Sequence, residues 1–284
     1  MSSEHIIDEI DEQTLVQFIS LVHKHTGITL ALNRKTMLQG RIKPRVRQLG
    51  LHGYKEYLAL LESSREEIQI LTDLVTTNET YFYRTPRIWS YLEKEYMPQW
   101  VESHSGGVFN AWSAAASSGE EAHTLGVVLQ SIKTKRPALK YQILGSDISN
   151  DILNHAIKGE YSGRSIEQFR NDRPELFKGH MRPNGESGFS VESDVRKNIK
   201  FQQHNLFNTL KVKEKFDLVL LRNVLIYFEA SDQEKVLFNV SQVMKPDGLL
   251  IIGESESLSR LATPFSYKMP LIYGLAANKK ENAA

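Results

Sequence analysis

The sequence predicts an α/β protein in which a doubly wound parallel sheet follows an all-helical N-terminal domain and carries a small β-rich insertion. Up to about residue 107 the chain shows amphipathic helix patterns and no strand pattern. Beyond it, short apolar runs alternate with amphipathic helices, which is typical of a parallel sheet covered on both faces. We expect a helical domain over 1–80, a linker helix over 81–106 and a ligand-binding domain over 107–284. The insertion in the ligand-binding domain is expected over 160–198.

The composition excludes several kinds of site. The chain has no cysteine, so disulfides, thiolate metal sites and a cysteine nucleophile are ruled out. Its nine histidines show no metal-binding spacing, and we expect no metal. The first residues lack the pattern of a signal peptide, and no apolar run is long enough to cross a bilayer. We therefore expect a cytoplasmic protein without membrane insertion.

Capping residues mark the expected helices of the N-terminal domain. Asp11 can cap a helix that runs to about His25, and Gly27 can end it. Asn33 can cap a second helix that ends before Gly50. Two more helices are expected near 53–62 and 65–76.

The second helix is expected to be strongly basic. The chain has no Asp or Glu from Gln13 to Lys55, although its net charge is only +1. A local positive field attracts an acidic partner, and the alternative is a solvated helix face. Pro44 lies inside this helix and should kink or break it. The candidate docking residues are Arg34, Lys35, Arg41, Lys43, Arg45 and Arg47.

Apolar runs mark the strands of the expected sheet. Ser149 or Asn150 can cap the helix after the second strand, and another helix is expected near 231–244. The insertion at 160–198 contains a hairpin-turn signal, with a long disordered loop as the alternative. The expected strands are 108–112, 141–146, 199–203, 216–221 and 249–253, followed by a pair of edge strands within 265–275.

A turn of small residues follows the first strand and leads into Glu120 and Glu121. Small residues there let a cofactor approach the backbone beside a helix N-terminus, although they can also serve tight packing. Two carboxylates would repel a pyrophosphate but would suit an ammonium and a sulfonium group. The turn therefore favours S-adenosylmethionine over a dinucleotide. The alternative is that both acids only complement the helix dipole.

Polar residues also end the second and fourth strands. Asp147 ends the second strand, where a carboxylate can accept hydrogen bonds from ribose hydroxyls or else cap the next helix. Arg222 and Asn223 end a very apolar strand, which is costly unless they are paired. They can meet a ligand, or Arg222 can form a structural ion pair. Tyr227 points a phenol toward the same place, and the polar and aromatic run 76–84 suggests a site at the domain interface.

At these residues the chain closely resembles the CheR-type chemotaxis receptor methyltransferases. The resemblance covers nearly the whole chain and implies a class I methyltransferase (Rossmann-like) sheet that binds S-adenosylmethionine across strands one, two and four. It implies a protein-glutamate O-methyltransferase that esterifies glutamates of chemoreceptors during chemotactic adaptation and releases S-adenosylhomocysteine. The matching segments are 77–84, 112–121, 146–148, 222–228 and 245–248.

The resemblance also implies roles for single residues. Arg84 and Tyr227 would lie nearest the methyl group as catalytic residues. The basic second helix would face the cytoplasmic domain of the receptor, and in some family members the insertion holds a peptide at the receptor's C-terminus. The residues expected to line the cofactor are Asn78, Thr80, Arg84, Ala114, Glu121, Asp147, Asn205, Leu206, Arg222 and Asn223.

Two departures from the family pattern stand out, and other functions stay open. Ala122 replaces a proline that is frequent in the family, and Pro44 interrupts the basic helix. One alternative is a methyltransferase of RNA or small molecules, since a basic helix permits RNA contact. Another is a non-catalytic signalling adaptor that binds S-adenosylmethionine or a receptor. A dehydrogenase is disfavoured because no GxGxxG motif occurs. We favour the receptor as partner and expect no nucleic acid.

Overall fold

Four helices form the N-terminal part of the chain in the computed structural model, which describes residues 9–276. The Asp11 carboxylate accepts a hydrogen bond from the Thr14 amide, and Gly27 ends the first helix in the left-handed conformation, so both predicted caps are confirmed. Phe18, Ile42 and Tyr57 are fully buried in the core of this bundle. The helices are α1 (Glu12–Thr26), α2 (Lys35–Gln48), α3 (Tyr54–Ser63) and α4 (Arg65–Val75).

The start of α2 differs from the prediction. A short 3-10 turn at Leu32–Arg34 contains Asn33, and α2 begins after it without a side-chain cap, so the predicted Asn33 cap is wrong. The helix also continues through Pro44 instead of breaking. Proline removes one helical hydrogen bond, but the buried face of α2, which includes Ile42 and Val46, anchors the helix on both sides of it.

After a non-helical linker at 76–85, a continuous helical stretch leads toward the first strand of the sheet. It consists of α5 (Pro86–Tyr91), a π-helical turn η2 (Leu92–Tyr96) and α6 (Met97–Ser103). Trp89 and Leu92 are fully buried where this stretch packs on the sheet.

The large sheet has seven strands in the order β6-β2-β1-β7-β8-β10-β9. The first five pair in parallel, and β10 pairs antiparallel to both β8 and β9. The edge strands are β6 and β9. The expected pair of edge strands at the end of the chain is therefore corrected, because β10 lies inside the sheet: Ile272 of β10 is buried, whereas most of β9 is exposed. The strands are β1 (Val108–Ser113), β2 (Lys140–Asp147), β6 (Ile199–Gln203), β7 (Phe216–Leu221), β8 (Met244–Ile252), β9 (Phe265–Met269) and β10 (Ile272–Leu275).

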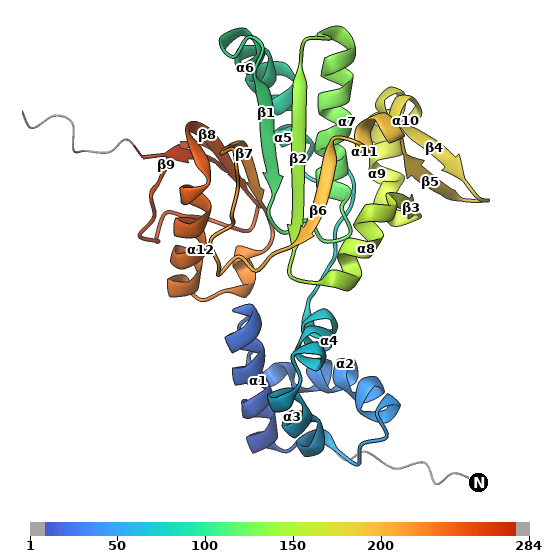
Figure 1. The fold of residues 1–284 in the computed structure, drawn as a ribbon, viewed down its shortest axis with the longest axis vertical. Helices are drawn as coiled ribbons and strands as arrows, with labels where there is room; N and C mark the ends of the chain where they lie inside the picture. Colours follow the sequence, from blue (N-terminus) through green and yellow to red (C-terminus); the bar gives the residue numbers. More distant parts are fainter. Residues whose placement is uncertain (1–8, 277–284) are drawn as a thin grey trace, which may run out of the picture.

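Two hydrophobic cores cover the two faces of this sheet. The first contains residues of α5, α6 and α7 (Glu120–Lys135), and the second contains residues of α12 (Ala230–Gln242). After β2, Ser149 caps α8 (Asn150–Lys158) by accepting a hydrogen bond from the Ile152 amide. The carboxyl ends of the central parallel strands point toward the helical bundle (Figure 1). In the described chain, no helix has the length and apolarity needed to span a membrane.

The insertion holds a second, three-stranded sheet in the order β3-β5-β4. The predicted hairpin is present, because β4 and β5 pair antiparallel around the turn at 185–187. The same segment contains three helices that its polar composition concealed, and Phe169 and Phe177 bury their aromatic faces. The elements are β3 (Glu160–Ser162), α9 (Arg164–Asp172), α10 (Pro174–His180), β4 (Met181–Asn184), β5 (Gly188–Val191) and α11 (Ser193–Arg196).

Candidate active site

A cavity of about 690 Å³ lies between the carboxyl ends of the strands and the helical bundle. This volume is typical of small-molecule sites. Its wall comes from the turns after β1, β2, β6 and β7, from the linker at 75–84 and from the loop between α1 and α2. All ten residues predicted to line a cofactor, together with Tyr227, are in this wall. Segments far apart in the sequence therefore meet at one place.

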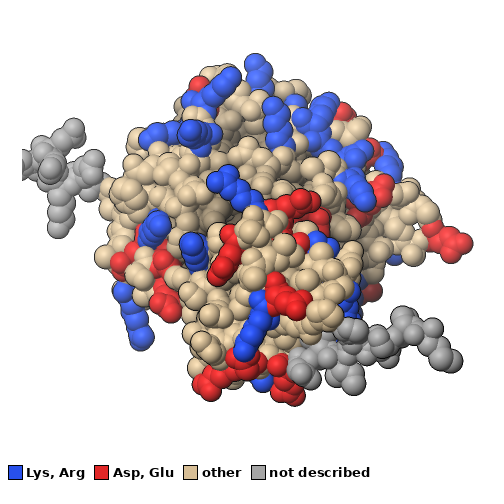
Figure 2. Space-filling model, turned by 60° about the horizontal axis from the view of Figure 1, so that its bottom comes forward, with Lys and Arg blue, Asp and Glu red and all other residues tan. Residues whose placement is uncertain are grey.

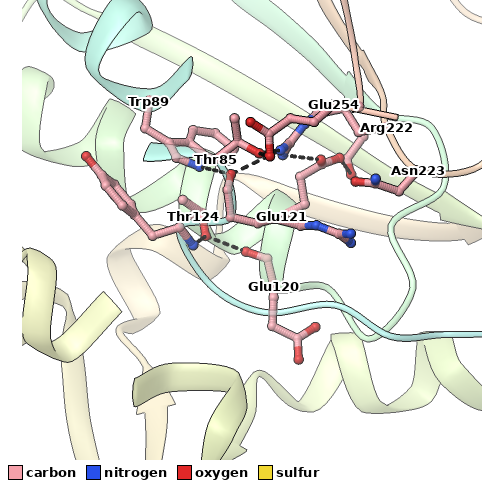
Figure 3. A network of polar contacts seen from close by, with 12 residues as sticks. Thr85, Trp89, Glu120, Glu121, Thr124, Arg222, Asn223 and Glu254 are labelled. Atoms are coloured by element: carbon pink, nitrogen blue, oxygen red, sulfur yellow. Dashed lines mark hydrogen bonds and ion pairs between the residues drawn. The ribbon is translucent and has the colours of Figure 1, made fainter. Parts of the chain in front are cut away.

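A buried ion pair connects three of these segments. Arg222, after β7, donates from Nη1 to Glu121 Oε2 at 3.0 Å and from Nη2 to Thr85 Oγ1 at 2.8 Å. Nη2 also donates to the carbonyl oxygen of Arg84 at 3.0 Å. The side chains of Arg222 and Glu121 are 2% and 12% exposed, so the pair is shielded from water. Figure 3 shows Arg222 between the start of α7 and the linker. The structural ion pair that was the alternative for Arg222 is therefore present.

The Asp147 carboxylate is held by backbone amides. Its Oδ2 accepts from the Ser117 amide at 2.9 Å and its Oδ1 from the Ser149 amide at 3.1 Å. It does not cap α8, because Ser149 takes that role. Burial raises the pKa of Asp147 above its usual value, although these amide hydrogen bonds oppose the change. Each carboxylate oxygen can accept a further hydrogen bond, which leaves room for ribose hydroxyls.

The two acids at the start of α7 have different surroundings. Glu121 reaches the cavity, where its Oε1 also accepts a hydrogen bond from Ser113 Oγ at 2.7 Å. Glu120 does not line the cavity and is only 3% exposed. It accepts a hydrogen bond from Ser118 Oγ at 2.6 Å, and burial raises its pKa to about 7.

The two predicted catalytic side chains keep most of their polar atoms available. Arg84 stacks its guanidinium over the Tyr81 ring at 5.5 Å and makes one long hydrogen bond, 3.4 Å, to the Glu79 carbonyl. Tyr227 lies in the 3-10 turn η3 (Leu225–Tyr227), and its phenol has no hydrogen-bond partner within residues 9–276. Both side chains can therefore interact with a ligand or an acceptor.

The basic side chains of α2 and of the 3-10 turn before it divide into paired and unpaired groups. Arg41 donates to the carbonyls of Val75 and Thr76 at 2.5 and 2.9 Å, and Arg45 makes two hydrogen bonds to Glu67 at 2.8 and 2.7 Å. These two guanidinium groups hold α2 against α4. Lys35 pairs with the exposed Glu9. The remaining candidates, Arg34, Lys43 and Arg47, show no ion pair in the described part of the chain.

The charge on the surface around the bundle is mixed. Figure 2 brings the bundle forward and shows mainly Lys and Arg in the upper part of the view and both signs in the lower part. Of the six predicted docking residues, Arg34 and Arg41 line the cavity. The basic helix thus contributes to the wall of the cavity.

Comparison with known proteins decides the family. The model described as the CheR methyltransferase, SAM binding domain, matches residues 78–270. The model described as the CheR methyltransferase, all-alpha domain, matches residues 13–76. The chain belongs to the CheR methyltransferase family. The two matches meet at the linker that forms part of the cavity wall.

Curated relatives of this CheR-family chain cover it almost completely. A chemotaxis protein methyltransferase of Klebsiella aerogenes is 32% identical over 266 residues, which are 91% of this chain and 88% of the relative. The enzyme of the same name from Salmonella typhimurium is 31% identical and covers 91% and 88%. Chemotaxis protein methyltransferase 1 of Pseudomonas aeruginosa is 30% identical and covers 89% and 92%. The chain is an S-adenosylmethionine-dependent methyltransferase with the class I fold.

The cavity wall fits this cofactor. Arg222 Nε and His204 Nε2 are buried without a hydrogen-bond partner among the described residues, and both residues line the cavity. Such atoms are rare unless water or a ligand meets them. The carboxylates of Asp147 and Glu121 in the same wall suit the hydroxyl and cationic groups of S-adenosylmethionine.

Sequence reasoning missed part of the wall. His204 and the loop after α1, which includes Ile28 and Leu30, also line the cavity. The Thr29 amide donates to the Tyr227 carbonyl at 2.9 Å. Asn205 Nδ2 donates to the His25 carbonyl at 2.9 Å. These contacts use backbone atoms, which leave no signal in residue type.

Proposed function

We propose that this CheR-family enzyme methylates glutamate side chains of chemoreceptors, which yields glutamyl methyl esters and S-adenosylhomocysteine. The observation that supports it most is the cavity itself. The residues of the sheet domain that suit S-adenosylmethionine line this cavity, and so do Arg34 and Arg41 beside them. Arg84 and Tyr227 also line it, and most of their polar side-chain atoms have no partner among the described residues. This arrangement suits an anionic acceptor such as a carboxylate.

The chemistry needs alignment more than proton transfer. Bound S-adenosylmethionine supplies a methyl group activated by its sulfonium; a glutamate oxygen forms the new C–O bond as the C–S bond breaks. Glutamate has a solution pKa of about 4.3 and is already ionised at neutral pH, so no strong base is required. Holding the reactants in line can lower the barrier by roughly 7–11 kcal/mol.

Each cavity residue receives a proposed role from its surroundings. Asp147 would accept hydrogen bonds from the ribose hydroxyls. Arg84 would hold a carboxylate with its planar guanidinium, either that of the acceptor or that of the cofactor. Tyr227 would orient the attacking oxygen. The other proposed cofactor contacts are Asn78, Thr80, Ala114, Glu121, Asn205, Leu206, Arg222 and Asn223.

The receptor would meet two surfaces of the enzyme. The relatives are chemotaxis methyltransferases by name, and we extend this to the cytoplasmic domain of a chemoreceptor, with the reaction in the cytoplasm. The basic residues of α2 would face its acidic methylation region. The insertion at 160–198 would hold a peptide from the receptor's C-terminus. The receptor would then dock on the helical domain, 1–80, and the cofactor would bind in the domain 107–284. The segment 81–106 would link the two.

Label transfer tests this function. The enzyme is incubated with methyl-labelled S-adenosylmethionine and membranes that carry chemoreceptors, and the membranes are then treated with mild base. We expect label on the receptor that base releases as methanol, since carboxyl esters hydrolyse under these conditions. Base-stable label, or label on RNA, would refute the glutamate acceptor. Cofactor binding without any transfer would refute catalysis.

A further inference from the structure

Glu256, in the loop after β8, binds four backbone amides with one carboxylate. Its Oε1 accepts from Val224 at 2.9 Å and from Leu225 at 2.8 Å. Its Oε2 accepts from Asn223 at 3.0 Å and from Gly253 at 2.5 Å. Three of these donors are consecutive residues of the turn after β7. Glu256 itself does not line the cavity.

That turn forms one wall of the cavity. Asn223, Val224, Ile226 and Tyr227 all line it. Asn223 has φ +59°, in the left-handed region that residues other than glycine rarely adopt. Such a conformation persists only where the surroundings hold it. The Glu256 carboxylate can hold this conformation because it accepts hydrogen bonds from three successive amides, as a bound anion does in a backbone nest.

The atoms around the same turn are closely packed. A Cβ atom added to Gly253 would lie 2.8 Å from the backbone nitrogen and Nδ2 of Asn223 and from Glu256 Oε2. The ends of β7 and β8 therefore meet closely, with the Glu256 carboxylate between them. A substitution of Glu256 should therefore change the backbone position of Asn223, whose amide donates to it.

We propose that Glu256 is a positioning residue: its carboxylate holds the 223–225 turn and thereby places Asn223 and Tyr227 for cofactor binding and methyl transfer. The effect on transfer rests on the proposed function, whereas the effect on cofactor binding does not depend on the acceptor. The geometry needs both carboxylate oxygens, because each receives two N–H groups. A glutamine keeps the shape but turns an NH₂ group toward two of those donors.

The test compares Glu256→Gln with Glu256→Asp and with the control Glu234→Gln. Glu234 also accepts a backbone amide, that of Ala262 at 2.7 Å, but it does not line the cavity. Calorimetry measures affinity for S-adenosylhomocysteine, steady-state assays give kcat and KM, and circular dichroism checks folding at the assay temperature.

We expect Glu256→Gln to weaken product binding at least tenfold and to lower kcat at least tenfold while the protein remains folded. Glu256→Asp keeps two oxygens and should recover part of both, and Glu234→Gln should match the wild type. Wild-type affinity and kcat in folded Glu256→Gln would overturn the proposal, even if its melting temperature fell. If receptors are not methylated by the wild type, the affinity comparison still decides the role of Glu256.

Discussion

Arg222 and Glu121 show how much of the site can be predicted from single residues. An arginine at the end of an apolar strand must be paired, and this expectation is confirmed. Its partners could not be read from the sequence, because Glu121 and Thr85 lie 101 and 137 residues away. The same holds for Glu256, whose carboxylate accepts from backbone N–H groups. Every residue type except proline offers such a donor.

Replacing Arg222 alone should lower the free energy of unfolding more than replacing both Arg222 and Glu121. We expect Arg222→Met to lower the free energy of unfolding by about 3–5 kcal/mol, because the Glu121 carboxylate stays buried without its partner. Adding Glu121→Gln should restore part of that loss. Denaturant unfolding of the two single variants and the double variant measures the coupling, and strictly additive losses would argue against the pair.

Glu120 should make stability depend on pH. Burial raises its pKa from 4.5 to about 7, so the folded state holds a proton that the unfolded state has lost in this interval. Its contribution to stability therefore falls as pH rises from about 4.5 to 7, by roughly 2–4 kcal/mol. Glu120→Gln should remove this slope and be more stable than the wild type at pH 8. Parallel pH profiles of unfolding for both proteins would contradict this.

Tyr227 should act on turnover and not on cofactor affinity. We expect Tyr227→Phe to lower kcat about 10–100-fold, because the phenol no longer orients the acceptor oxygen. Binding of S-adenosylhomocysteine should stay within about twofold, since the ring still fills the wall of the cavity. Calorimetry and methyl-transfer assays separate the two quantities, and equal losses in both would speak against an orienting role.

At the scale of elements, apolar runs predicted most of the architecture. The strand at 216–221 has the predicted bounds, because a buried parallel strand leaves a nearly continuous apolar signal. The edge strand at 199–203 also has the predicted bounds, although only Ile199 in it is buried. Three features escaped prediction for physical reasons. Asn33 does not cap α2, because it lies inside the 3-10 turn that precedes the helix. The position of β10 depends on pairing with β8, and the helices of the insertion have narrow buried faces.

The basic residues of α2 should separate into structural and docking groups. Arg45→Met leaves the buried Glu67 with Tyr57 alone, and we expect about 3 kcal/mol lower stability. Replacing Lys43 and Arg47 by Gln should change stability by less than about 0.5 kcal/mol. The second change should raise KM for the receptor about three- to tenfold, with the difference fading at high salt. Unchanged receptor KM in that double variant would exclude docking through these residues.

At the scale of the whole molecule, the helical bundle completes the cavity. His23 Nε2 lies 2.8 Å from Asp232 Oδ2 of α12, and backbone contacts through Thr29 and Asn205 join the bundle to the sheet domain. The sheet side of the cavity could be predicted, because ligands bind where parallel strands end. The bundle side could not, since its lining depends on how two units dock. One cavity thus combines residues of the sheet domain with Arg34 and Arg41 of the helical bundle.

A crystal structure of the enzyme with S-adenosylhomocysteine tests most directly whether this cavity is the cofactor site. We expect ligand density between the strand ends and the bundle, with both ribose hydroxyls within hydrogen-bond distance of the Asp147 carboxylate and with Arg222 Nε or His204 Nε2 paired to the ligand. Density at another place, or a ribose turned away from Asp147, would contradict the assignment.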